Sequence, residues 1–512
     1  MKRWSVKMWH FFAGAVFVFA GLAGQQIQRI PKVWDDAAVA SAIVPLTDVR
    51  ATPVQLPSKY YYGIPVRPIY RSYPVYHPEH EPKGYIDWLK QQDPQIAFDA
   101  AKLKTPEDWI KAGEIVFDAP ISYGHIFRLA ATSDLYLRLP DWYRSTGAPL
   151  AKDGSVPFYR YVIREKGKIE IGVNSCGMCH TRVMPDGSVI KGAQGNFPFD
   201  RSFAWEMRHG PKLLGPVTSF MARGVEHMLY SAPWIQPDVF PEIDSLSWEG
   251  LAERHEAVPP GVVSRHGSSP HVPTKVPDLI GIVERRYLDA TGLVRHRDID
   301  DLMRYAVMNQ DTDVAGKYGN FVPLESVPFG LGKLPADPAK DAGGRYSDEQ
   351  LYALALYIYS LRPPVNPNRP DALSAAGKKI FEREGCAGCH TPPLYTNNKR
   401  TPVAGYRSSP NDADVTRIPV GTDPALALKT RRGTGYYKVP SLKGVWYRGP
   451  FEHSGSVATL EDWFDRRRLR DDYVPTGFKG FGVVRRPVKG HEFGLDLSDE
   501  DGRALIAFLK TL

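Results

Sequence analysis

The chain has 512 residues, of which 43% are hydrophobic and 12% are aromatic. This composition supports packed cores and excludes a globally disordered protein, and the length predicts two to four domains. The formal charge of +8 is spread thinly along the sequence. Because no nucleic-acid-binding motif accompanies that charge, no nucleic-acid partner is expected.

Three basic residues within the first seven precede an apolar run from Met8 to Gly24. This pattern is typical of a secretory signal peptide, with small residues near its end for cleavage. The run is also nearly long enough to span a bilayer as an uncleaved anchor. Either alternative for residues 1–24 places the rest of the chain in the periplasm or outside the cell. Membrane contact is expected only if this segment is retained.

Residues 25–110 are rich in proline and tyrosine, as in the strings that begin at Lys59 and Ile69. Because proline interrupts regular elements, we expect a mostly extended N-terminal arm that packs on the body through its tyrosines. One helix is predicted near residues 85–92.

All four cysteines fall in two Cys-x-x-Cys-His strings, at Cys176, Cys179 and His180 and at Cys386, Cys389 and His390. This string is the attachment signature of c-type haem. Two thiols three residues apart on a helical turn reach the two vinyl groups of one porphyrin, and the adjacent histidine lies under the iron as a metal ligand. A redox dithiol or a pair of disulfides would leave the repeated histidine unexplained, and a zinc site would not need an exported chain. We therefore expect two covalently bound haem c groups.

Two further pieces of sequence recur in the same order around these strings. Residues 112–117 resemble residues 376–381, each as a short helix that leads towards a haem string. The string Lys275–Gly281 resembles Lys438–Gly444, as Lys-Val-Pro-x-Leu-x-Gly. Amphipathic closing helices are predicted at 299–308 and 460–468. The order predicts a duplicated cytochrome domain.

The fold is expected to be mainly α, with two c-type haem domains. A helix over 347–361 precedes a proline-rich linker, which places a boundary near residue 365. The first haem domain then covers 111–364 and carries long irregular insertions at roughly 118–170 and 200–270. The second haem domain covers 365–512.

Sixth ligands of the irons follow by elimination. No methionine lies beyond Met308, so the second domain cannot supply one to its own haem. Its only histidines besides His390 are His453 and His491. We favour His491, in a glycine-flanked loop before a last helix capped by Ser498, and interpret His453 as a surface or propionate-bonding residue. Haem 1 has six candidate histidines that no spacing singles out, so an open haem 1 is expected: His209, His227, His255, His266, His271 and His296.

The strings Val439–Val445 and Pro450–Glu461, together with the two haem strings, resemble the bacterial di-haem cytochrome c peroxidase superfamily over roughly residues 110–512. That superfamily includes the di-haem enzyme that matures the tryptophan tryptophylquinone cofactor and the di-haem rubber oxygenases. The resemblance implies that peroxide or O2 reacts at haem 1 and that haem 2 transfers electrons. The loop around His491 is most similar to the rubber-oxygenase branch.

The sequence departs from the peroxidase pattern at several positions. Leu288 stands where the peroxidase loop has tryptophan, and the position of the distal glutamate falls near Met308, with Gln310 close by. Arg466 or Arg467 occupies the region where relatives place a methionine or tyrosine. These departures predict an apolar distal pocket without an acid–base group. Tyr287, Met308 and Gln310 are the candidate catalytic residues at haem 1, and Tyr287, Trp205 and Trp234 are candidate aromatics near or between the haems.

We therefore interpret the chain as an exported di-haem oxidoreductase, oxygenase-like, that activates O2 or peroxide at haem 1 for an organic substrate. A small cytochrome or similar redox partner would exchange electrons with haem 2. The alternatives are a di-haem cytochrome c peroxidase and a non-catalytic electron-transfer cytochrome. Peroxidase relatives also hold Ca2+ between domains, although no dense acidic loop marks such a site here.

Overall fold

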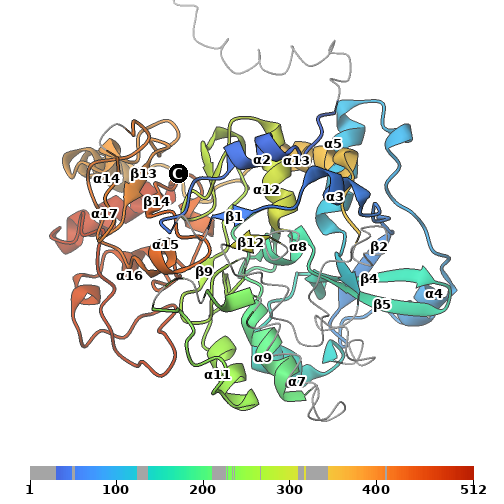
Figure 1. Cartoon of the computed structure of the whole chain (residues 1–512). Helices are drawn as coiled ribbons and strands as arrows, with labels where there is room; N and C mark the ends of the chain where they lie inside the picture. The colour runs from blue at the N-terminus through green and yellow to red at the C-terminus, as the bar shows by residue number, and fades with distance from the viewer. Residues whose placement is uncertain are drawn as a thin grey trace, which may run out of the picture.

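The fold was analysed in a computed structural model, which describes residues 30–48, 52–123, 136–209, 227, 229–232, 235, 237–265, 267–309, 316–318, 344–409 and 412–512. The predicted signal or anchor, Trp234, His266 and Gln310 lie outside these residues. Helices predominate over strands, as expected. Figure 1 places α14 and α17 on one side of the molecule, β4 and β5 on the opposite side, and α12 and α13 between them.

The N-terminal arm contains regular elements and is not simply extended. Its elements are α2 (Asp36–Ala42), β1 (Pro53–Val54), α3 (Ser58–Gly63), β2 (Ser72–Tyr76), α4 (Tyr85–Gln91) and the 3₁₀ turn η2 (Ala100–Lys102). The prediction of a helix near 85–92 is confirmed by α4. Tyrosines do pack the arm on the body, since Tyr61 is 1% exposed in a core that includes residues of α12 and α13, and Tyr62 donates its hydroxyl to Asp348 at 3.3 Å.

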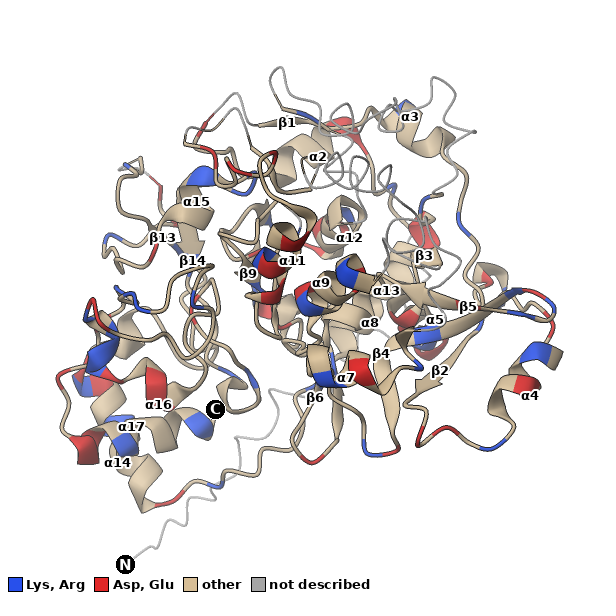
Figure 2. Ribbon diagram, turned by 90° about the horizontal axis from the view of Figure 1, so that it is seen from below, with Lys and Arg blue, Asp and Glu red and all other residues tan. Residues whose placement is uncertain are grey.

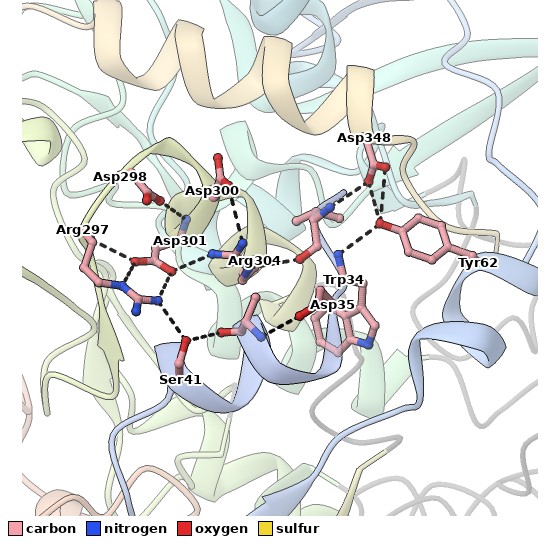
Figure 3. Close-up of polar contacts among 12 residues, drawn as sticks. Trp34, Asp35, Ser41, Tyr62, Arg297, Asp298, Asp300, Asp301, Arg304 and Asp348 are labelled. Atoms are coloured by element: carbon pink, nitrogen blue, oxygen red, sulfur yellow. Dashed lines mark hydrogen bonds and ion pairs between the residues drawn. The ribbon is translucent and has the colours of Figure 1, made fainter. Parts of the chain in front are cut away.

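Polar contacts fasten the start of the arm to α12 (Ile299–Val307) and α13 (Asp348–Ser360), as Figure 3 shows. The backbone N–H of Val33 donates to Asp348 Oδ1 at 3.3 Å, and its carbonyl accepts from Arg304 Nε at 3.2 Å. Arg304 also pairs with Asp301 at 2.8 Å. The backbone of Val33 therefore connects the arm to both α12 and α13.

The first insertion is a sheet with a helix, which corrects the expectation of irregular structure at 118–170. The strands β3 (Ser122–Tyr123), β4 (Ser155–Glu165) and β5 (Lys168–Val173) join β2 of the arm in the order β2-β4-β5-β3. Alternating apolar side chains on β2 and a nearly continuous apolar run on β4 bury one side of the sheet. A short helix, α7 (Pro140–Thr146), covers it. The second insertion holds a pair of contacting helices, α9 (Phe199–His209) and α11 (Trp248–Glu256).

A pair of helices that cross at a glycine occurs in both halves of the described chain. In the first half α5 (Pro106–Asp118) packs on α13, and in the second α14 (Ala372–Arg383) packs on α17 (Asp499–Lys510). Both crossings use a glycine: an added Cβ would lie 2.0 Å from the Ala353 carbonyl oxygen at Gly113 and 1.9 Å from that of Ala504 at Gly377. The two predicted haem-leading helices therefore meet a later helix of their own half in the same way.

The two Lys-Val-Pro-x-Leu-x-Gly strings also adopt matching conformations. Each ends in a left-handed glycine, Gly281 at φ 71° and Gly444 at φ 75°, and continues into a 3₁₀ turn, η4 (Ile282–Glu284) or η10 (Val445–Tyr447). The closing helix of the first half forms as α12. The predicted helix at 460–468 was wrong, because α16 (Leu460–Trp463) stops and the 3₁₀ turn η11 (Arg466–Leu469) follows.

The remaining elements are short and mostly connect the helices. They include α8 (Cys176–Cys179), α15 (Ala425–Lys429) and the 3₁₀ turn η9 (Cys386–Gly388). The described residues also form five two-stranded ladders. These are β1 with β12 (Lys317–Tyr318), β6 (Thr181–Val183) with β7 (Val189–Lys191), β8 (Val262–Val263) with β9 (Thr274–Lys275), β10 (Tyr287–Leu288) with β11 (Val294–Arg295), and β13 (Arg400–Pro402) with β14 (Tyr436–Lys438). Acidic and basic residues are interspersed along the helices of both halves (Figure 2). None of the helices in the described part of the chain is long and apolar enough to span a bilayer.

We predict that Gly377→Ala destabilises the protein by about 1–3 kcal/mol, because the new methyl group would force α14 away from α17. Gly502→Ala is the matched control, since Gly502 lies on α17 with no atom near its missing Cβ. That control should stabilise the protein by up to about 1 kcal/mol through helix propensity. Urea unfolding of the two variants measures both effects, and equal stabilities would contradict the close crossing.

Candidate functional site

The first Cys-x-x-Cys-His string forms one helical turn that presents its histidine to a loop of the same half. Ser175 caps α8 by accepting from the Met178 backbone N–H at 3.0 Å. His180 Nδ1 lies 3.0 Å from the carbonyl oxygen of Pro277, in the first Lys-Val-Pro loop. A carbonyl can only accept, so Nδ1 carries the proton and Nε2 is the nitrogen with a lone pair. Burial lowers the pKa of His180 to about 4, which keeps the ring neutral.

The second string repeats this arrangement. His390 Nδ1 lies 3.1 Å from the carbonyl oxygen of Pro440, the proline that matches Pro277 in the second loop, and 3.2 Å from that of Tyr395. A hydrogen bond from Nδ1 to a backbone carbonyl is the usual support for a histidine that ligates metal through Nε2. Both candidate iron ligands are therefore held in the tautomer that ligation requires.

The four cysteines form no disulfide with one another, and burial raises the pKa of each thiol. Burial raises the pKa of Cys176 to about 12 and that of Cys386 to about 11. Redox dithiols and zinc ligands need the opposite shift. Across the described residues no group of three or more His, Cys, Asp and Glu side chains could hold a metal ion, so a Ca2+ site stays a prediction from the resemblance.

The imidazole rings of His390 and His491 face one another with centroids 6.2 Å apart. An iron with a nitrogen ligand at about 2 Å on either side would set two imidazole centroids about 6 Å apart, so the spacing fits a haem iron. Burial, and then the proximity of His390, lowers the pKa of His491 to about 3. Its Nδ1 is buried without a hydrogen-bond partner in the described structure. The two rings are tilted by 54° to one another, are kept neutral by burial, and lie at a spacing that two ligands of one iron would have.

The loop that carries His491 is fixed by its glycine and by Arg468. An added Cβ at Gly490 would lie 2.3 Å from the backbone of Gly421, so the glycine permits a close approach to the chain. Arg468 is 1% exposed and donates to the carbonyl oxygens of Val488 at 2.6 Å, Gly490 at 2.9 Å and His491 at 2.8 Å. This inward side chain is the tertiary reason why the helix at 460–468 breaks.

His453 lies elsewhere and has other partners. Its ring stacks on Tyr437 with centroids 4.2 Å apart and contacts the Glu452 carboxylate. Its carbonyl oxygen accepts from the backbone N–H of Lys275 at 2.9 Å, which joins the two halves. This histidine is therefore an interface residue of the second half.

A cavity of about 200 Å³ lies against the first haem string, and its walls come from both halves. Cys176, Cys179 and His180 line one wall. Leu302, Tyr305, Ala306 and Asn309, on or just after α12, line another with Leu354 and Ile358 of α13. The cavity continues to Lys438, Val439 and Pro440 in the second half. Most of its lining is apolar, and His180 is the only histidine among the described residues that line it.

The structure places the candidate residues for haem 1 in different parts of the molecule. Tyr287 lines the cavity, where its hydroxyl donates to Asp414 at 2.9 Å and the Arg400 guanidinium lies over its ring. Met308 does not line it but lines a second cavity of about 40 Å³, so a role for Met308 at haem 1 stays a prediction. Gln310 lies outside the described residues. Trp205 packs in another core and stacks on His209.

The histidine candidates for haem 1 that the structure describes lie away from this cavity. His227 contacts Asp244, His271 contacts Glu242, His255 contacts Asp200, and His296 contacts Tyr359. Each is therefore bound to its own polar partner, in agreement with the expectation that spacing would single out none of them.

The cavity wall also carries a buried ion pair, which corrects the expectation of a pocket without acid–base groups. Asp289 pairs with Arg432, and the Tyr305 hydroxyl donates to Asp289 Oδ2 at 3.2 Å. Arg432 Nη2 donates to Asn309 Oδ1 at 3.3 Å. Sequence reasoning missed Arg432 because it is 143 residues from Asp289 and belongs to the other half. The positive φ of Asp289, 74°, turns its carboxylate into this cluster.

Four cations gather where the two halves meet. Lys275 and Arg285 of the first half correspond in register to Lys438 and Arg448 of the second, and all four line the cavity. Burial lowers the pKa of Lys275 to about 8 and that of Lys438 to about 7. The repeated Lys-Val-Pro string and the arginine ten residues after its lysine were the signal that could have found this cluster.

One carboxylate lies among these cations. Asp278 Oδ2 is 3.9 Å from Arg285 and 3.7 Å from Arg448, and no ion pair to a described carboxylate involves either lysine. A buried excess of positive charge is costly unless anions compensate it. The donor set therefore fits anionic groups such as the two propionates that each haem carries.

No family model matches the chain. The methylamine utilization protein MauG of Methylorubrum extorquens is 27% identical over 146 residues, which are 28% of this chain and 35% of MauG. The uncharacterized protein y4iM of Sinorhizobium fredii is 26% identical over 136 residues, which are 21% of this chain and 32% of that protein. The chain thus matches about a third of the length of these curated relatives.

Two solved structures were also found. Hydrazine synthase of Kuenenia stuttgartiensis has a TM-score of 0.26 and 16% identity, with 58% of this chain and 88% of that chain covered. A MauG-like protein associated with microbial copper homeostasis has a TM-score of 0.23 and 18% identity, with 36% and 62% covered. The relationship that the sequence matches support is to MauG.

We predict that Arg468→Met destabilises the protein by about 3 kcal/mol, because buried carbonyls of the His491 loop lose a charged donor. The matched control is Arg467→Met, whose exposed side chain pairs only with its neighbour Asp465 and should leave stability unchanged. Chemical denaturation compares the two variants, and hydrogen exchange of residues 488–492 locates the change. A loop that exchanges alike in both variants would contradict the role of Arg468.

Proposed function

We propose that the chain is an exported di-haem c-type oxidoreductase. The iron of haem 1 would have one protein ligand and an open face, and the iron of haem 2 would have two protein ligands. The observation that carries the proposal is the repeated histidine arrangement, in which each Cys-x-x-Cys-His histidine donates Nδ1–H to the matching proline carbonyl of its own half. The proposed attachment and ligand residues are Cys176, Cys179 and His180 for haem 1 and Cys386, Cys389, His390 and His491 for haem 2.

The two halves would be duplicated haem domains, 111–364 and 365–512. The matching helix crossings at Gly113 and Gly377 and the matching glycine turns support this assignment. The similarity to MauG, at 27% identity over 28% of the chain, accords with a di-haem cytochrome of that superfamily. Export is proposed from the apolar run near the N-terminus and from the need of c-type haem attachment for a compartment outside the cytoplasm.

Haem 1 would lie in the 200 Å³ cavity, attached at Cys176 and Cys179 and held by His180, and its iron would supply the site where O2 or peroxide reacts. The residues of this chain shape that reaction. The apolar walls from α12 and α13 would pack on the porphyrin and exclude bulk water from it. The ion pair of Asp289 and Arg432 gives one wall fixed charges that can orient a small polar reactant.

Haem 2 would transfer electrons between haem 1 and a small cytochrome or similar partner. His390 and His491 would occupy both faces of its iron, which excludes substrate and gives a lower potential than a methionine ligand would. The four cations Lys275, Arg285, Lys438 and Arg448 would hold propionates of the two haems at the junction of the halves. Each half contributes one lysine and one arginine to this cluster.

A peroxidase is the second candidate, and the buried Asp289–Arg432 pair is the observation that favours it, since peroxide chemistry needs groups that move a proton. Turnover of hydrogen peroxide with a reduced cytochrome donor at about 1–10³ per second would assign the chain to that class. Oxygenase-like chemistry requires O2-dependent oxidation of an organic substrate instead. In a non-catalytic electron carrier, both irons would be six-coordinate.

We predict that the reduced protein binds one carbon monoxide per chain, because only haem 1 has an open face. Absorption and paramagnetic-resonance spectra with and without the gas count the open sites. Mass spectrometry of the same sample, expected to exceed the polypeptide mass by two haems, reports attachment. If neither iron binds carbon monoxide, the catalytic proposal fails and the electron carrier remains.

We predict that His491→Ala converts haem 2 from a low-spin to a high-spin or water-ligated iron, because the ring opposite His390 is removed. His453→Ala is the control and should leave the haem 2 spectrum low-spin, since His453 stacks on Tyr437. Paramagnetic resonance of the ferric protein distinguishes the two. A His491→Ala spectrum identical to the original would move the ligand assignment to another residue.

A further inference from the structure

Three side chains form a partition between the two cavities of the first half. Tyr305, Asn309 and Arg432 line both the 200 Å³ cavity next to His180 and the 40 Å³ cavity beneath the arm. The partition is polar although most of the walls around it are apolar. The polar groups of these three side chains therefore face one cavity or the other.

The smaller cavity has its own polar groups. Gln55 Oε1 and the Nε and Nη1 atoms of Arg431 are buried there without a hydrogen-bond partner in the described structure. Buried polar atoms of this kind are normally satisfied by ordered water, and 40 Å³ is room for about three molecules at 10–15 Å³ each. Arg431 therefore lines the smaller cavity, whose polar atoms water would satisfy, and it does not line the larger one.

Arg432 is oriented differently from its neighbour. Asp289 and Asn309, both on the wall of the larger cavity, hold its guanidinium, and Tyr305 holds Asp289 in turn. A guanidinium keeps its charge inside a protein and carries five N–H donors in a fixed plane. Replacing a buried ion pair with apolar residues is often neutral or stabilising, so stability alone does not require this pair.

We propose that Arg432 is the hydrogen-bond donor that recognises a small anionic or peroxidic ligand at the open side of haem 1, with Asp289 and Asn309 as its positioning residues. This inference rests on the proposed function. It assigns the recognition of the reactant at haem 1 to the second half of the chain, although His180 and the attachment cysteines belong to the first. Tyr305 completes the cluster by fixing the carboxylate that orients Arg432.

The test is fluoride binding to the ferric protein, because fluoride is a small anion whose affinity rises when an N–H donor faces it. Arg432→Gln should weaken fluoride binding by about tenfold or more, and Arg432→Lys should retain part of the affinity because it keeps a charged donor. Arg431→Gln is the matched control and should bind fluoride within about twofold of the original protein. Carbon monoxide binding and haem content should be unchanged in all three variants.

The outcomes separate the inference from the function it rests on. Equal fluoride affinity in Arg432→Gln and the original protein would overturn the role of Arg432 while haem 1 remains open. An equal loss in Arg431→Gln and Arg432→Gln would also overturn it, because the effect would then come from the fold around both residues. If the original protein binds neither fluoride nor carbon monoxide, the proposed open haem 1 itself is wrong.

Discussion

The hydrogen bond from a histidine Nδ1 to a proline carbonyl is the constraint on which the rest of this structure depends. It occurs twice, from His180 to Pro277 and from His390 to Pro440, and each time it fixes which nitrogen of the ring can bind a metal. The Lys-Val-Pro loop has to lie beside the Cys-x-x-Cys-His turn for this bond to form. The crossing helices in each half, closed on Gly113 and Gly377, frame that arrangement.

The two halves share this arrangement but differ in the residues that lie near the imidazole ring of His180 or His390. In the second half, Arg468 and Gly490 bring His491 opposite His390, so the site is filled by protein. In the first half, α12 and α13 border a cavity in which His180 is the only histidine among the described lining residues. The same loop therefore lies beside a pair of histidines in one half and beside a single histidine in the other. The difference lies in the segments that follow each repeat.

Local signals made much of this predictable from sequence. The predicted helix at 347–361 matches α13 closely, Ser498 was recognised as the N-cap of α17, and the repeated strings located the two histidines and the middle of α14. Elements that depend on distant partners were missed. The helix at 460–468 breaks because Arg468 turns inward to carbonyls 20 or more residues away, and the sheet of the first insertion takes a strand from the arm. The Asp289–Arg432 pair joins two halves that no local pattern connects.

The placement of Arg432 has a consequence for how this protein comes into being. One wall of the 200 Å³ cavity is built from a loop near residue 290 and another near residue 432, and Thr434 also donates its hydroxyl to the Thr291 carbonyl at 2.7 Å. During synthesis from the N-terminus, the earlier loop exists long before the later one is made. A copy truncated before residue 432 would therefore keep His180 and Pro277 but would leave the Asp289 carboxylate without the guanidinium that compensates its charge.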